Sequence, residues 1–145
     1  MLVAIDGSEP AAKALNYTLT LAEKCGAEVH IISVVPPVDS IMPRFTLAAP
    51  PSTVYTFFVN EMEKKLKIVL SESLKKAKEK KPKLTISTRL LHGHPADTIV
   101  QTAKEEGFDI IVVGSRGLSG TEELFLGSVS DRVADRATCP VLIVK

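Results

Sequence analysis

The sequence predicts an α/β domain built on a parallel five-stranded sheet with helices on both faces. Strand-like runs alternate with helix-like runs along the whole chain, which is the order that produces parallel sheets. The Ile-Ile-Val-Val run at 110–113 is apolar without alternation, as in a strand that is covered on both faces. The length of 145 residues fits one domain with a sizeable core. We therefore expect a single doubly wound domain over residues 1–145.

The first half of the chain supplies two strands and one helix. Leu2–Ile5 is an apolar run that stops at Asp6-Gly7-Ser8, and Ser8 is a suitable N-cap for the helix that follows. Gly26 is placed to end that helix, and Val29–Val35 is the second strand. The buried face of the helix is predicted to hold Ala11, Leu15, Thr18, Leu19 and Ala22.

A proline-rich loop is predicted at residues 36–53, where five of the nine prolines lie. Loops of this length in a compact domain are often functional or mobile. A long helix follows and ends at Pro82. Its opposite face is rich in lysine, which indicates a solvated surface more than an anion-binding stripe. Its buried face is predicted to hold Phe58, Met62, Leu66, Val69 or Leu70, and Ala77.

The second half adds three strands and two helices. The strands are predicted at Leu84–Leu91, Asp109–Val113 and Cys139–Val144. A helix begins at Pro95 and ends at Gly107. A second helix follows the glycine- and serine-rich stretch at 114–130, with one side formed by Val129, Val133 and Ala137.

Two turns look built for a ligand, and they indicate the strand order. They follow the first strand (Asp6-Gly7-Ser8) and the fourth strand (Gly114–Gly117). Ligands of doubly wound sheets bind beyond the carboxyl ends of the strands, where the strand order reverses. If both turns serve one site, strands 1 and 4 are neighbours. This favours the order 3-2-1-4-5 over the alternative 2-1-3-4-5.

The stretch GSRGLSGTEELFLGSVS at 114–130 is typical of phosphate binding. Glycines allow backbone N–H groups to approach an anion closely, and Gly127 stands where the last helix begins, with its dipole directed at a ligand. The hydroxyls of Ser128 and Ser130 can add donors. No Gly-Lys-Ser/Thr follows, so this is not a P-loop, and it does not open the first βα unit as a dinucleotide fingerprint would. The alternative is a flexible loop with a glycine at a helix start.

The whole chain resembles the universal stress protein family, most weakly at residues 36–60. The resemblance is carried by VAIDGSEPAAKAL at 3–15, by LLHGHPADTIVQTAKEEGFDIIVVGSRG at 90–117, and by the G-x2-G-x9-G-S pattern followed by the closing CPVLIVK. It implies a Rossmann-like, adenine nucleotide alpha hydrolase-like fold. The glycine pattern is the mark of the family's ATP-binding branch.

The resemblance also implies roles for individual residues. Asp6 is similar to the acidic residue that contacts the ribose, although it is also placed to cap the first helix or to bond its own turn. The backbone of Val34 would read the adenine edge, unless Val34 is a plain core residue. Ala4 and Ile5 would border the adenine. The phosphate loop would comprise Val113, Gly114 and Gly117, closed by Gly127, Ser128, Val129 and Ser130.

Two further positions have weaker claims. Arg116 occupies a variable site from which it would reach a terminal phosphate or remain in solvent. Gly93 matches a family glycine near the nucleotide. His92 and His94 form a His-x-His pair, but a zinc site needs at least three protein ligands, so we assign no metal ligand.

The expected function is that of an ATP-binding regulatory module for stress responses. The ligand is expected to be ATP, ADP or AMP, with Mg²⁺ or Mn²⁺ held mainly by phosphates and water. No catalytic residue is assigned, because no committed base accompanies Ser128. The alternatives are a slow ATPase that acts as a timed switch and a protein-interaction module with a structural nucleotide.

Composition and charge exclude several partners. A formal net charge of +1, 5% aromatic residues and no Trp argue against nucleic acid. No apolar stretch approaches the ~18 residues of a membrane helix, and Cys25 and Cys139 read as ordinary thiols of a cytoplasmic protein. The last strand is apolar on both faces at Val141–Val144 and falls at a sheet edge, so a homodimer through this strand is expected. A further protein partner is expected but not identified.

Overall fold

The computed structural model of the chain describes residues 1–37, 52–118 and 126–145. Strands and helices alternate in the predicted order. The strands are β1 (Leu2–Ala4), β2 (Val29–Val35), β3 (Ile86–His92), β4 (Ile111–Gly114) and β5 (Val141–Val144). The helices are α1 (Glu9–Cys25), α2 (Ser52–Lys80), α3 (Pro95–Glu105) and α4 (Ser128–Arg136).

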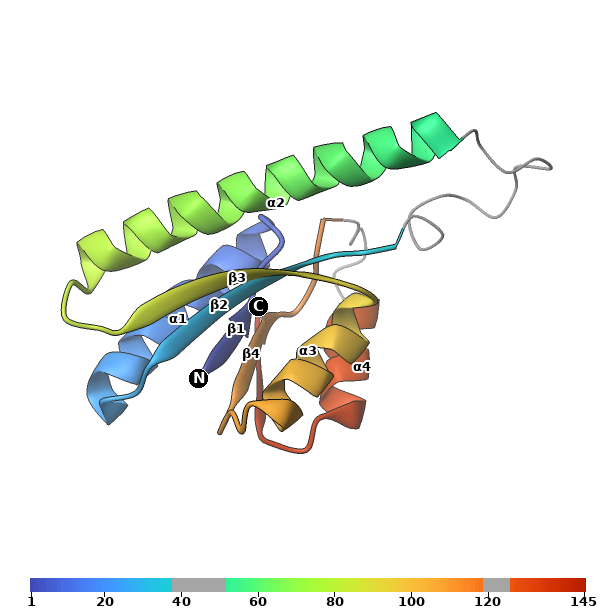
Figure 1. The fold of residues 1–145 in the computed structure, drawn as a ribbon. Coiled ribbons are helices and arrows are strands. Elements are labelled where there is room, and N and C mark those ends of the chain that lie inside the picture. Colours follow the sequence, from blue (N-terminus) through green and yellow to red (C-terminus); the bar gives the residue numbers. More distant parts are fainter. Residues whose placement is uncertain (38–51, 119–125) are drawn as a thin grey trace.

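All strand pairs are parallel, and the order across the sheet is β3-β2-β1-β4-β5. This confirms the order that we inferred from the two ligand-type turns. β1 pairs with β2 on one side and with β4 on the other. The strands after β1 are therefore added first on one side of β1 and then, from β4 on, on its other side. The carboxyl ends of β1 and β4 therefore form the switch point where ligands bind in such folds (Figure 1).

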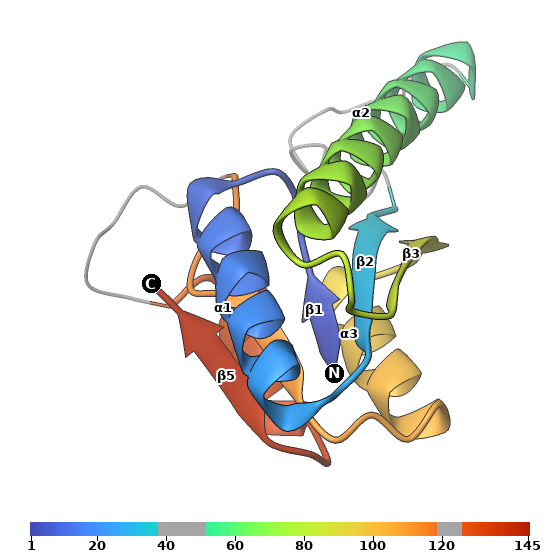
Figure 2. The same ribbon diagram turned by 90° about the vertical axis from the view of Figure 1, so that its left-hand side faces the viewer.

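Helices cover both faces of the sheet, with α1 and α2 on one face and α3 and α4 on the other (Figures 1 and 2). Each face has its own apolar core. The core under α1 and α2 includes Val3, Leu15, Leu19, Ile31, Leu70 and Val112. The core under α3 and α4 includes Leu2, Ile32, Ile99, Ile111, Val113 and Val133. Residues 111–113 of β4 thus alternate between two buried faces, as their unbroken apolar run predicted.

The ends of α1 also agree with the sequence. Ser8 is its N-cap, with the hydroxyl accepting a hydrogen bond from the Ala11 N–H, and Gly26 ends it in the left-handed conformation (φ 63°). All five residues that we expected on its inner face are buried.

Several predicted details are wrong. Helix α2 begins at Ser52, so positions 52 and 53 are helical, while 38–51 of the predicted loop lie outside the described residues. Phe58 was expected in the core but is 47% exposed, because the first turns of α2 extend beyond the sheet. Val129 is 37% exposed in the first turn of α4. Strands β3, β4 and β5 each begin two residues later than predicted, and β1 ends one residue earlier.

Within the described ranges, no helix is long and apolar enough to cross a membrane. In the same ranges, no group of three or more His, Cys, Asp or Glu side chains is placed to hold a metal ion. His92 instead lies 3.4 Å from a carboxylate oxygen of Glu63. Cys25 and Cys139 are both free thiols.

Candidate functional site

The β1–α1 turn and the loop after β4 are joined by the side chain of Asp6. One carboxylate oxygen accepts the N–H of Ser8 at 2.9 Å, and the other accepts the N–H of Leu118 at 3.2 Å. The alternative in which Asp6 bonds its own turn is therefore confirmed, and the carboxylate holds the second turn as well. A carboxylate offers about four lone-pair positions, so this half-buried group keeps acceptor capacity for a further donor.

Ser8 provides a second link between the same two turns. Its hydroxyl donates to the carbonyl of Arg116 and accepts from the N–H of Ala11, each at 3.4 Å. These are long, weak hydrogen bonds. Together with Asp6 they fix where the loop after β4 lies relative to the start of α1.

Each glycine of the spaced pattern has a neighbour that a side chain would strike. A Cβ on Gly114 would lie 2.7 Å from the backbone of Pro10 and of Ala11. A Cβ on Gly117 would lie 2.6 Å from a carboxylate oxygen of Asp6. A Cβ on Gly127 would lie 3.2 Å from the Cα of Arg116 and 3.3 Å from the carbonyl oxygen of Ser115. The φ angle of Gly127 itself is −66°. The glycine pattern at 114, 117 and 127 therefore allows close packing between segments. At Gly127 the reason for a glycine is this packing and not a left-handed backbone.

The start of α4 is anchored to the end of β4. The N–H of Gly127 donates to the carbonyl of Ser115 at 2.8 Å. The Ser130 hydroxyl is buried and lies 2.9 Å from the carbonyl oxygens of both Ser115 and Gly127. The Ser130 hydroxyl and the Gly127 N–H thus bond carbonyl groups of the protein itself, and their contact with phosphate stays a prediction.

The N–H groups of α4 that have no acceptor inside the helix belong to positions 128–130. The first bond of the helix runs from the N–H of Asp131 to the carbonyl of Gly127 at 3.0 Å, so the three preceding N–H groups have no acceptor within the helix. Gly127 supplies no capping side chain. The side chains of Ser128 and Val129 are exposed, so this helix start is open to a ligand.

The backbone of Val34 points toward the β1 side of the sheet, just past the end of β1. The carbonyl of Ile32 accepts the N–H of Ile5, and in a parallel ladder the residue two positions further presents its groups to the same side. Pairing between β1 and β2 ends at Ala4 and Ile32. The Ile5 carbonyl, which a longer ladder would offer to Val34, accepts the Ser33 hydroxyl at 2.7 Å.

The structure brings most of the other expected residues to the same edge of the sheet. Ala4 is half-buried and Val113 buried on the α3 and α4 face, whereas Ile5 is buried in the opposite core. Arg116 is half-buried in the loop after β4. Gly93 directly follows β3, which lies two strands away from β1, and its φ of 139° beside Thr98 is a local reason for a glycine.

The sequence did not indicate a groove of about 380 Å³ between α1 and α2. It adjoins the β1–α1 turn, and its lining comes from that turn and from the two helices. The lining includes Gly7, Ser8, Leu15, Val69, Lys76 and Lys80. Among the described residues, none of the loop after β4 or of α4 lines this groove, so it is separate from the helix start at 128–130.

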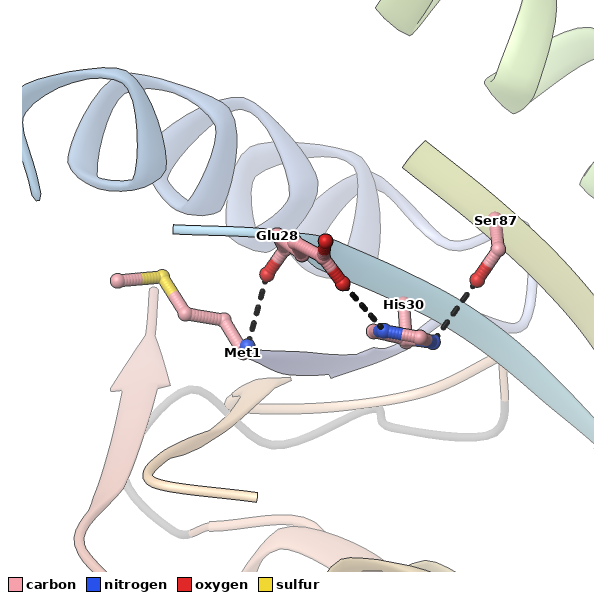
Figure 3. Close-up of polar contacts among 4 residues, drawn as sticks. All are labelled: Met1, Glu28, His30 and Ser87. Carbon is pink, nitrogen blue, oxygen red and sulfur yellow. Dashed lines mark hydrogen bonds and ion pairs between the residues drawn. The ribbon is translucent and has the colours of Figure 1, made fainter. Parts of the chain in front are cut away.

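A second polar cluster lies at the opposite, amino-terminal edge of the sheet (Figure 3). Ser87 Oγ lies 2.8 Å from His30 Nδ1, and Glu28 lies 3.8 Å from His30 Nε2, which is beyond hydrogen-bond distance. The α-amino group of Met1 donates to the Glu28 carbonyl at 2.8 Å. Burial lowers the pKa of this amine more than the negative charges of Asp109 and Glu28 raise it. The exposed Ser87 and the long Glu28 contact do not make a catalytic triad.

The fold and the carboxyl-terminal edge of the sheet define a class of protein. It is a doubly wound α/β domain with an open helix start at its switch point. The chain belongs to the universal stress protein family, whose family model matches residues 1–145. It is 40% identical to Universal stress protein YxiE of Bacillus subtilis (strain 168), over 100% of this chain and 97% of that protein.

Solved structures agree with this assignment. Universal stress protein UspA from Lactobacillus plantarum has the same fold, with a TM-score of 0.84 and 22% identity over 99% of this chain and 95% of that one. A universal stress protein crystallised in complex with cAMP matches with a TM-score of 0.68 and 27% identity, over 99% of this chain and 93% of that one.

Proposed function

We propose that this protein binds an adenine nucleotide, ATP with Mg²⁺ or Mn²⁺, at the carboxyl ends of β1 and β4, and that it acts as a nucleotide-dependent regulatory module. The observation that carries the proposal is the open start of α4. The N–H groups at positions 128–130 have no acceptor within the helix, and the positive end of the helix dipole favours an anion there.

The phosphates lie at this helix start. The Ser128 side chain is exposed beside the three N–H groups and adds a hydroxyl donor. Gly127 brings the helix start close to Ser115 and Arg116, since a side chain there would crowd their backbone. The side chain of Arg116 is the candidate for a terminal phosphate.

The nucleoside lies toward β1 and β2. Asp6 accepts a ribose hydroxyl with the lone pairs that Ser8 and Leu118 leave. The N–H and carbonyl of Val34, directed past the end of β1, form a donor and acceptor pair for the adenine edge. The relative that was crystallised with cAMP supports this reading, because cAMP shares the adenine, the ribose and one phosphate with ATP.

The residues at this edge fit a metal ion that is held by the phosphates. Asp6 is the one carboxylate among the proposed contacts, and both of its oxygens already accept backbone N–H groups. Mg²⁺ keeps several waters and takes phosphate oxygens readily. The metal would neutralise phosphate charge, while the chain supplies N–H and hydroxyl donors.

We further propose a homodimer through β5. This strand is at the edge of the sheet, and no other strand of the described residues pairs with its outer side. Its four side chains are half-buried. A second copy that adds its β5 would complete the ladder.

Isothermal titration calorimetry with ATP and MgCl₂ tests nucleotide binding. We expect one site per chain, competition by ADP, AMP and cAMP, and none by inorganic phosphate at equal concentration. Heat of binding that is absent for well-folded protein, shown to be nucleotide-free by mass spectrometry, would contradict the proposal. Incubation of the complex at 37 °C reports on turnover, and steady release of ADP would favour the timed switch over the regulatory module.

A further inference from the structure

The first turns of α2 extend past the sheet and expose large apolar side chains. Figures 1 and 2 both show this helix projecting beyond the other elements. Phe57 is 62% exposed, and its ring contacts that of Phe58 edge to face at 6.1 Å between centroids. Ile68, three turns further on, is 58% exposed. Contiguous apolar surface rimmed by polar residues marks interaction sites, and the neighbouring rings of Phe57 and Phe58 begin such a surface on α2.

Four of the exposed residues of α2 share one side of the helix, which we call the outward face of α2 and define as Phe57, Glu61, Lys64 and Ile68. Their spacings of four, three and four residues repeat on one side of an α-helix. The opposite side, which includes Leu66, is buried against the sheet. Glu61 and Lys64 form an ion pair at 2.8 Å and are both exposed.

This face is complementary to itself. Along the helix it reads apolar, acidic, basic, apolar. If a second α2 runs antiparallel across it, with the two-fold axis between positions 62 and 63, Phe57 meets Ile68 of the second copy and Glu61 meets Lys64 of the second copy. Both pairs have the same midpoint, so one register satisfies the apolar and the charged contacts together. A two-fold interface requires such self-complementarity.

We propose that the outward face of α2 is an interface with a second copy of this chain, in which two α2 helices pack antiparallel. Charge complementarity selects this partner. An anionic surface would favour the lysines but would repel Glu61, which stands between the two apolar positions. A second copy satisfies each charge and buries each exposed apolar side chain of the face.

This interface is compatible with a dimer through β5. Helix α2 packs on β2 and β3, whereas β5 forms the far edge of the sheet beyond β4. The two surfaces therefore do not overlap, and each can be occupied without the other. The inference does not depend on nucleotide binding, because no residue of the outward face of α2 belongs to the proposed nucleotide site.

Charge reversal in the full chain tests the register. In the proposed register, position 61 of each copy faces position 64 of the other. The Glu61→Lys variant therefore places lysine opposite lysine at both contacts, and the Lys64→Glu variant places glutamate opposite glutamate. We expect sedimentation equilibrium to show that each variant self-associates at least about tenfold more weakly than the parent, since like charges across an interface oppose association. The matched control is Lys75→Glu, an exposed lysine of the same helix whose opposite position, 50, lies before the helix begins.

Mixing the two reversed variants gives the decisive result. In an equimolar mixture of Glu61→Lys and Lys64→Glu, the lysine introduced at position 61 of one chain can face the glutamate introduced at position 64 of the other. The unchanged Lys64 and Glu61 of the same two chains then face each other, so association at the parental strength should return. The combined Glu61→Lys/Lys64→Glu variant should also associate as the parent does. No effect within a single helix can restore association upon mixing.

Three outcomes overturn the proposal: a parent that is monomeric at every concentration, reversed variants that associate like the parent, or a mixture that associates no more strongly than its components. ATP titration of the same variants separates this inference from nucleotide binding. All of them should bind ATP as the parent does, whatever their assembly state.

Discussion

The loop after β4 passes so close to Asp6 that Gly117 has no room for a side chain. A Cβ at position 117 would stand 2.6 Å from the Asp6 oxygen that also accepts the Leu118 N–H. The glycine thus allows the loop to lie on the carboxylate. Asp6 is thereby held in place from the β4 side as well as from its own turn.

Gly117→Ala should weaken ATP binding with little loss of stability. The methyl group displaces the carboxylate of Asp6, which is the flexible end of a side chain. The free energy of unfolding should therefore fall by only about 0.5–1.5 kcal/mol, as for an off-rotamer side chain. Loss of the ribose contact should lower affinity by roughly 1.5–3 kcal/mol, the value of a hydrogen bond to a charged group. Calorimetry and thermal unfolding measure the two effects.

Gly107→Ala is the matched control. Position 107 has a φ of 67° and nothing within 4 Å of an added Cβ, so alanine there strains the backbone without touching a neighbour. This variant should lose stability and keep its affinity for ATP. Equal affinity of Gly117→Ala and the parent would show that Asp6 does not contact the nucleotide.

Gly127→Val should abolish ATP binding while the fold remains. Because φ is −66°, the backbone is not strained by a side chain, and the cost comes from crowding against Ser115 and Arg116. Overpacking of this kind costs about 1–3 kcal/mol of stability. We expect a folded protein by circular dichroism and no heat of binding. A folded valine variant with parental affinity would mean that the start of α4 is not the phosphate site.

Gly114→Ala should act mainly on stability. Its Cβ would stand 2.7 Å from backbone atoms of Pro10 and Ala11, and backbone cannot turn aside as a side chain does. The first turn of α1 must then move away from β4. We expect urea unfolding without nucleotide to show a loss near the upper end of the overpacking range, about 3 kcal/mol. A loss no greater than that of Gly127→Ala would be inconsistent with this packing.

Hydrogen exchange at β5 should depend on protein concentration. The carbonyls of Pro140 and Val144 accept bonds from β4, so the backbone groups of Val141 and Ile143 point to the open edge of the sheet. If β5 pairs with a second copy, the amides of Val141 and Ile143 should become protected as concentration rises. The amide of Leu142, which points to β4, is the internal control. Fast exchange of Ile143 at every concentration would exclude this dimer.

The sequence predicted the architecture well because its signals are local. The Val29–Val35 segment comes after the helix-ending Gly26 and directly before two prolines, and the strand has the predicted bounds. The cap at Ser8 depends only on its own turn. The strand order was found from two turns that had to share one site.

What the sequence did not predict depends on contacts between distant segments. Phe58 fits a helical apolar pattern, but no local signal reveals that the sheet ends before it. The glycine spacing was interpreted as phosphate binding or a flexible loop, whereas Gly114 and Gly117 are matched to Pro10 and Asp6, more than a hundred residues away. His30 and Ser87 meet only through the β2–β3 register.

A ¹H–¹⁵N NMR titration with ATP and MgCl₂ locates the nucleotide, because it reports on each backbone N–H separately. We expect the amides of Ser128, Val129 and Ser130 to shift most, together with those of Gly117 and Val34. Amides along α1 and α2 that border the groove between these helices, such as those of Leu15 and Lys76, should shift little. Large shifts at that groove with an unchanged start of α4 would show that the nucleotide does not bind at the carboxyl ends of β1 and β4.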